Sequence, residues 1–168
     1  MIASAFLALA ASCAPQIDIG TSSALVAVES GFNPYAIGVV GGALERQPTQ
    51  LAEAVATARA LQANGWNFSA GIGQINVRNF HRLGLTLEGA FNPCANLQAM
   101  QMILADCFDR ARSRSASVQL ALRKALSCYY SGNFTTGFEH GYVRRVAAHV
   151  SRPAIGSASS IPHPKELP

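Results

Sequence analysis

The sequence predicts a mainly α-helical domain with little or no β structure, and three observations support this fold class. Apolar residues recur at helical spacing in several segments, most clearly from Pro93 to Arg112. No long segment alternates apolar and polar residues with the period of two that is typical of a half-buried strand. Glycine and proline gather between the periodic segments, where they favour turns. We therefore expect one helical domain over residues 1–150, within the usual size of ~100–200 residues.

The composition excludes several classes of protein. Of the 168 residues, 49% are hydrophobic and only 13% are charged, which argues against long disordered segments. No apolar run approaches the ~20 residues that a membrane-spanning helix requires. The net charge of +4 suits an acidic partner, such as nucleic acid, anionic lipid or a carboxylate-bearing cell wall. No helix-turn-helix, zinc-finger or aromatic-basic pattern supports binding to nucleic acid. Neither nucleic acid nor a membrane span is expected.

The first half of the chain is expected to contain three helices. An apolar helix at residues 2–12 should end before Pro15, because proline cannot continue a helix. A hydroxyl-bearing residue at 21–23 can cap a second helix that runs to Ser30. A third helix is expected from about Thr49 to Ala63. The N-terminal stretch lacks the positively charged segment of a secretory signal, so no export signal is evident.

The second half is expected to contain three more helices. The longest runs from about Pro93 to Arg112, and a short serine-rich link separates it from a helix that begins near Val118 and ends before Gly132. The remaining expectations are a loop at 32–42, an extended or turn-like segment at 66–75, one helix over 138–150, and a flexible tail rich in proline and serine at 151–168.

Glu29 is the leading candidate for chemistry. Leu25 and Val26 lie four and three residues before it, so the carboxyl group shares their apolar helix face. Desolvation on such a face raises the pKa of a carboxylic acid, which lets it hold a proton near neutral pH, as a general acid must. The alternative interpretation is a solvated glutamate at the end of a surface helix.

A second candidate is the glycine-rich segment from Gly71 to Asn76. Glycines let the backbone approach a ligand closely, and Gln74 and Asn76 offer donors and acceptors suited to amides and sugar hydroxyls. The alternative is an ordinary tight turn capped by the asparagine. A third segment, 128–133, places two tyrosines before a helix-ending glycine, where a hydroxyl could position a carboxylic acid or pass a proton.

Together these segments resemble the lysozyme-like lytic transglycosylases, in particular the small enzymes of type IV secretion and conjugation systems. The resemblance rests on three motifs in the family's order: Glu-Ser-Gly-Phe-Asn-Pro at 29–34, Gly-x-x-Gln-Ile-Asn at 71–76, and Tyr-Tyr-Ser-Gly-Asn at 129–133. It extends over nearly the whole chain up to about residue 150. It implies a lysozyme-like helical domain that cleaves the bond between N-acetylmuramic acid and N-acetylglucosamine.

The resemblance also implies roles for particular residues. Glu29 matches the family's catalytic acid. The predicted substrate-binding residues are those of the matched motifs, with Asn76 added for its polar side chain. They are Ser30, Gly71, Gln74, Asn76, Tyr129 and Tyr142. Two positions depart from the family pattern: Gly73 replaces a methionine that lines the sugar groove, and Tyr130 replaces an asparagine. Both departures concern contacts with the substrate and leave the acid in place.

The four cysteines are dispersed along the chain, which is typical of two structural disulfides in an oxidising compartment. The short link at 113–117 makes its flanking helices antiparallel neighbours. This favours a Cys107–Cys128 pair and leaves Cys13 with Cys94, although four cysteines allow three pairings. The alternative is four reduced cysteines in the core. No cysteine or histidine spacing indicates a metal site, and neither a metal nor another cofactor is expected.

The expected function is thus a periplasmic lytic transglycosylase that forms 1,6-anhydromuramyl ends and opens the cell wall locally for a secretion channel. Its expected partners are peptidoglycan glycan strands and components of a type IV secretion system. Two alternatives stay open. A hydrolytic muramidase would cleave the same bond with water, and a non-catalytic scaffold would bind the wall without cleaving it.

Overall fold

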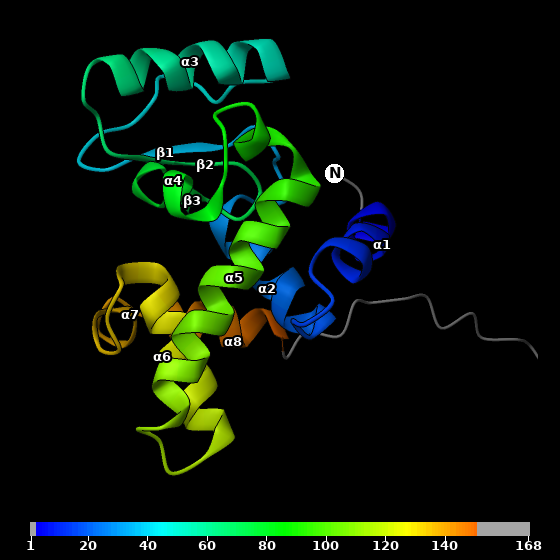
Figure 1. Cartoon of the computed structure of the whole chain (residues 1–168), viewed down its shortest axis with the longest axis vertical. Helices are drawn as coiled ribbons and strands as arrows, with labels where there is room; N and C mark the ends of the chain where they lie inside the picture. The colour runs from blue at the N-terminus through cyan, green and yellow to red at the C-terminus, as the bar shows by residue number, and fades with distance from the viewer. Residues whose placement is uncertain (1–2, 151–168) are drawn as a thin grey trace, which may run out of the picture.

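The computed structural model describes residues 3–150, and its regular structure is mostly helical (Figure 1). The helices are α1 (Ala3–Cys13), α2 (Ile19–Glu29), α3 (Leu51–Ala63), α4 (Phe80–Leu83), α5 (Pro93–Arg112), α6 (Val118–Ser131), α7 (Thr136–Glu139) and α8 (Tyr142–Val150). The strands are β1 (Ile37–Val39), β2 (Phe68–Ala70) and β3 (Ile75–Asn76), and the short 3-10 helices are η1 (Val77–Asn79) and η2 (Gly89–Phe91). The predicted mainly helical class with little β structure is confirmed. The expected tail at 151–168 and the first residue of the expected first helix lie outside the described residues.

Helix α5 connects the region that contains the small sheet and α3 with the region that contains α6, α7 and α8 (Figure 1). One end lies near the small sheet and α3, and the rest packs against α6. The apolar stripe predicted on this helix is buried at Leu97, Met100, Leu104 and Cys107. Helices α2 and α8, far apart in the sequence, also pack together, which brings a C-terminal helix beside the helix that carries Glu29.

The three strands form one antiparallel sheet in the order β1-β2-β3. Ile37 pairs with Ala70 across the first ladder, and Ala70 pairs with Ile75 across the second. The sequence indicated only a loop at 32–42 and an extended segment at 66–75, because two or three residues are too few to show the period of a strand. Residues 71–74 form the turn between β2 and β3.

Two helix boundaries differ from the expected ones. Helix α2 begins at Ile19 because Asp18, and not a residue at 21–23, is its N-cap, with Oδ1 accepting from the Thr21 N–H at 2.9 Å. The single helix expected at 138–150 is two helices, α7 and α8. They are separated at Gly141, whose φ of +69° is left-handed and interrupts a helix.

Two disulfides fasten α5 to its neighbours. Cys13 at the end of α1 is bonded to Cys94 in the first turn of α5, and Cys107 is bonded to Cys128 on α6. These are the pairs favoured from the sequence, and they indicate an oxidising compartment. Among residues 3–150, no helix combines the length and the apolar character needed to cross a bilayer.

Candidate active site

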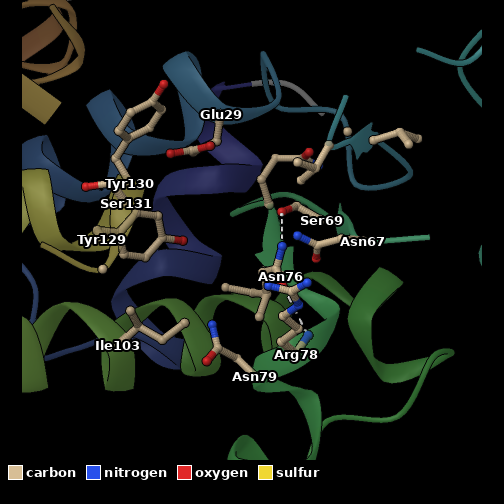
Figure 2. Close-up of a pocket in the computed structure, with 16 residues that line it drawn as sticks. Glu29, Asn67, Ser69, Asn76, Arg78, Asn79, Ile103, Tyr129, Tyr130 and Ser131 are labelled. Carbon is tan, nitrogen blue, oxygen red and sulfur yellow. Dashed lines mark hydrogen bonds between the residues drawn. The ribbon is translucent and has the colours of Figure 1, made fainter. Parts of the chain in front are cut away.

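A groove of about 580 Å³ runs between the sheet and the helices α2, α5 and α6 (Figure 2). It collects side chains from segments that are up to about a hundred residues apart in the sequence. The residues that line it are Glu29, Gly38, Val39, Val40, Asn67, Ser69, Gln74, Ile75, Asn76, Arg78, Asn79, Ile103, Tyr129, Tyr130, Ser131 and Gly132. Most of the side chains with a functional group are neutral amides and hydroxyls, which suits a ligand rich in amides and hydroxyls.

Glu29 is the last residue of α2 and presents a partly buried carboxyl group to this groove. Leu25 and Val26, on the same helix face, are fully buried. Burial raises the pKa of Glu29 from its ordinary value of 4.5 to about 7. The Tyr142 hydrogen bond and the positive charge of Arg145 lower the pKa, but burial outweighs both. Glu29 therefore holds a proton in a large fraction of molecules near neutral pH.

Tyr142 positions the carboxyl group of Glu29 from behind. It is the first residue of α8, its side chain is almost completely buried, and its hydroxyl donates a hydrogen bond to Glu29 Oε1. Burial is also the main reason why the pKa of Tyr142 lies far above its ordinary value, so the hydroxyl stays a donor. The ring of Tyr130 stacks on the Tyr142 ring with centroids 4.6 Å apart. Tyr142 does not itself line the groove.

Tyr129 occupies the groove wall next to the acid (Figure 2). Its hydroxyl donates to the Gly73 carbonyl oxygen at 2.6 Å, and burial raises the pKa of this phenol well above its ordinary value. A Cβ atom at Gly73 would lie 3.0 Å from Asn96 Oδ1 and 3.3 Å from the Tyr129 hydroxyl oxygen. The position is thus tightly enclosed, and glycine leaves room for the tyrosine to reach the turn.

The turn at 71–74 is held in a conformation that only particular residues can adopt. Gln74 has a left-handed φ of +52°, and its Nε2 donates to the Ala36 and Gly71 carbonyl oxygens, both at 2.9 Å. Gly71 has a φ of +80°, and a Cβ there would lie 2.0 Å from the Ala90 carbonyl oxygen. The glycine is therefore required by close packing behind the groove, and Gly71 does not line it.

The residues singled out from the sequence divide into two groups. Glu29, Gln74, Asn76 and Tyr129 line the groove together. Ser30, Gly71 and Tyr142 lie behind it and support these residues. Ser30 Oγ, for example, donates to the Ile72 carbonyl oxygen at 2.7 Å and so ties the end of α2 to the turn. Among the described residues, no group of three or more histidine, cysteine or acidic side chains could hold a metal ion.

Comparison with known proteins identifies the family. The family model described as the Transglycosylase SLT domain matches residues 6–150. The chain belongs to the SLT transglycosylase family. Among its relatives, the type IV secretion system protein virB1 of Brucella abortus biovar 1 (strain 9-941) is 53% identical over 149 residues, which cover 85% of this chain and 63% of the relative. Protein virB1 of Agrobacterium fabrum is 39% identical over 136 residues, which cover 80% of this chain and 54% of the relative.

The chain is therefore a close homologue of VirB1 proteins of type IV secretion systems and spans about three fifths of the length of the Brucella relatives. Protein virB1 of Rhizobium radiobacter is also 39% identical, over 88% of this chain and 62% of its own length. No solved structure matches the chain at a significant level.

Several contributors to this SLT domain site were not found from the sequence, among them the groove residues Asn67, Ser69, Arg78 and Asn79 and the buried Asn96. Asn96, on α5, is fully buried and hydrogen-bonds three backbone groups around the turn. Nothing in the local pattern distinguishes it from a surface asparagine except its position among the buried residues of the apolar stripe. Tyr130 was noted as one of two tyrosines in the segment 128–133 and as a departure from the family, but it was not among the predicted site residues. In the structure it lines the groove, stacks on Tyr142, and its hydroxyl lies 3.2 Å from His140 Nδ1.

Proposed function

We propose that the protein is a lytic transglycosylase in which Glu29 cleaves the β-1,4 bond between N-acetylmuramic acid and N-acetylglucosamine and leaves a 1,6-anhydromuramyl end. Membership of the SLT family supports transglycosylase activity. One observation carries the finer proposal: among the described residues, Glu29 is the single carboxylate in the groove, and its pKa is raised to about 7.

A single carboxylate restricts the possible mechanisms. Retaining glycosidases use a second carboxylate as nucleophile about 5–5.5 Å from the acid, and inverting enzymes use one as base about 6.5–9.5 Å away. The next acidic residues along the chain, Glu45 and Glu53, do not line the groove. Glu53 forms an ion pair with Arg46 and accepts a hydrogen bond from the Thr49 N–H at 2.9 Å. The Glu53 carboxylate therefore stabilises the start of α3 and does not face the groove.

The substrate itself can supply the nucleophile in place of a second carboxylate in the groove. Protonated Glu29 donates its proton to the glycosidic oxygen as the bond to the anomeric carbon breaks. The N-acetyl group of the muramyl sugar stabilises the positive charge that develops there. Glu29, now a carboxylate, accepts the proton of the C6 hydroxyl as that oxygen attacks the anomeric carbon. The anhydro ring closes, no water is consumed, and Glu29 is protonated again for the next turnover.

The neighbouring side chains orient these steps. Tyr142 holds one carboxyl oxygen of Glu29 and leaves the other available to the substrate. The side-chain amide nitrogen of Gln74 already donates hydrogen bonds to two backbone carbonyl groups. The side-chain oxygen of Gln74 is therefore the atom that can accept a hydrogen bond from a substrate hydroxyl or amide. The Tyr129 hydroxyl donates its proton to the Gly73 carbonyl oxygen, and its oxygen can still accept a hydrogen bond from a sugar hydroxyl.

We further propose that the enzyme acts in the periplasm on peptidoglycan strands and opens the wall locally for a type IV secretion system. The Brucella abortus relative carries that system in its name. The two disulfides are typical of an oxidising compartment, and the periplasm combines such conditions with the proposed substrate.

The product decides between this proposal and its alternatives. Purified peptidoglycan is digested with the protein, and the soluble muropeptides are analysed by mass spectrometry. Anhydromuramyl ends, one water lighter than reducing ends, are expected. Reducing ends alone would establish a hydrolytic muramidase instead, and an undigested wall that still binds the protein would establish a scaffold.

Tyr142→Phe is expected to move the alkaline limb of the pH–rate profile to higher pH. The tyrosine hydrogen bond favours the ionised carboxylate, so its loss raises the pKa of Glu29 further above about 7. The acid form then persists to higher pH, although the rate falls because the carboxyl group is less well oriented. The measurement is kcat/KM on soluble glycan strands across the pH range. Tyr35→Phe, outside the groove, serves as control, and a limb that moves to lower pH would contradict the assignment.

A further inference from the structure

The groove carries one positive charge that the proposed reaction does not use. Within the described residues, Arg78 on η1 is the single cation that lines the groove, as Glu29 is the single anion. Figure 2 shows Glu29 on the side of the two tyrosines and Arg78 on the other side, next to Asn76 and Asn79. The two charges thus lie toward opposite ends of the lined surface.

The guanidinium group of Arg78 has no hydrogen-bond or ion-pair partner among the residues that the structure describes. The ion pairs found in residues 3–150 are Arg46–Glu53, Arg59–Glu88 and Arg110–Asp106. Arg78 takes part in none of them, and its side chain donates no hydrogen bond to another described residue. A guanidinium group presents up to five donors in a planar fork that matches a carboxylate. At this position all of them are available to a ligand.

The backbone beneath Arg78 is fixed, although its side chain is exposed. Asn76 Oδ1 accepts a hydrogen bond from the Arg78 N–H at 3.1 Å and caps η1. Asn76 Nδ2 lies 3.5 Å from Ser69 Oγ on the neighbouring strand. The residue is therefore anchored to the sheet that forms this side of the groove, which reduces the entropy lost when its side chain engages a ligand.

We infer that Arg78 binds a carboxylate carried by the muramyl sugar. The carboxylate is either the lactyl group of a sugar without its peptide or a carboxylate of the attached stem peptide. This inference rests on the proposed function, because it names the part of the peptidoglycan strand that the same groove selects. The neutral amides and hydroxyls of the groove do not distinguish a charged N-acetylated glycan from an uncharged one. Arg78 adds a preference for strands that bear a negative charge.

The test measures binding, so it does not depend on turnover. Dissociation constants are determined on the Glu29→Gln background for chitotetraose, for a peptide-free muramyl tetrasaccharide with free lactyl carboxylates, and for the same tetrasaccharide with stem peptides. Adding Arg78→Gln is expected to weaken binding of carboxylate-bearing ligands by about three- to tenfold, as for a partly exposed ion pair. Binding of chitotetraose should stay unchanged. Arg78→Lys keeps the charge but loses the planar fork, so it should retain only part of the preference, and added salt should reduce the preference further.

Arg82→Gln is the matched control, because Arg82 is also exposed and close in sequence but does not line the groove. A loss confined to the peptide-free ligand assigns the lactyl carboxylate, and a loss confined to the other assigns the stem peptide. Equal weakening of all three ligands, or of none, would overturn the inference while leaving the proposed function intact. If the Glu29→Gln background binds no glycan at all, the proposed function fails first and the inference fails with it.

Discussion

Glu29→Gln is expected to reduce the rate of peptidoglycan cleavage by about 10²–10⁴-fold, the usual contribution of a general acid. The substitution keeps the size and the polarity of the side chain but removes the transferable proton. Within residues 3–150, no second carboxylate lines the groove to replace it. The measurement is the rate at which purified protein releases soluble anhydromuropeptides. Retention of more than about a tenth of the rate would show that another group supplies the proton.

The same variant offers a control for folding, because the sign of its effect on stability can be worked out. The pKa of Glu29 is raised from 4.5 to about 7 in the folded protein. Its contribution to stability is thus fully present below about pH 4.5 and is lost as the pH rises through 7. Above pH 7 the folded state holds a desolvated carboxylate, and glutamine removes that cost. Glu29→Gln should therefore be more stable than the wild type at pH 8, by about 3 kcal/mol at most. If the variant is instead less stable than the wild type, impaired folding could account for its loss of activity.

The helical part of the fold was largely predictable from the sequence because its signals are local. The α5 stripe repeats over five turns between Pro93 and Arg112, and the helix has those bounds in the structure. The small sheet was not predictable from its pattern. Its strands have two or three residues each, so their existence depends on pairing, and β1 pairs with a strand about thirty residues later in the chain. The break at Gly141 was missed for a related reason, since a single glycine does not by itself exclude a continuous helix.

The site was only partly predictable. Glu29 and the turn at 71–76 were found because their residue types have recognisable chemistry and match a family. The sequence could not show which of these residues face the groove and which support it from behind. Gln74 faces the groove, whereas Gly71 is required by packing behind it. Contacts such as Tyr142 with Glu29 join residues 113 positions apart, and the one local signal for Asn96 is its position within the apolar stripe of α5.

Asn96→Leu is expected to produce a large loss of stability. The side chain is fully buried and bonds three backbone groups: Nδ2 donates to the carbonyl oxygens of Ala70 at 3.0 Å and Ala90 at 2.7 Å, and Oδ1 accepts from the Gly73 N–H at 2.7 Å. Leucine has a similar size and satisfies none of them. An unpaired buried polar group costs about 1–3 kcal/mol, so the free energy of unfolding should fall by about 3–5 kcal/mol.

The loss should extend to activity, because the three bonds fix the turn that carries the groove residues. Without them the Gly73 carbonyl group no longer holds Tyr129 in place, and kcat should fall even at temperatures where the variant is folded. The checks are urea unfolding with the disulfides intact and the cleavage rate well below the unfolding temperature. Asn64→Leu is the matched control. Its amide is exposed and donates one hydrogen bond, to the Ala60 carbonyl oxygen at 2.7 Å, so it should cost less than about 1 kcal/mol. If the two variants unfold at similar urea concentrations, Asn96 does not hold the turn, and the shape of the groove must be maintained by the sheet and by Tyr129 alone.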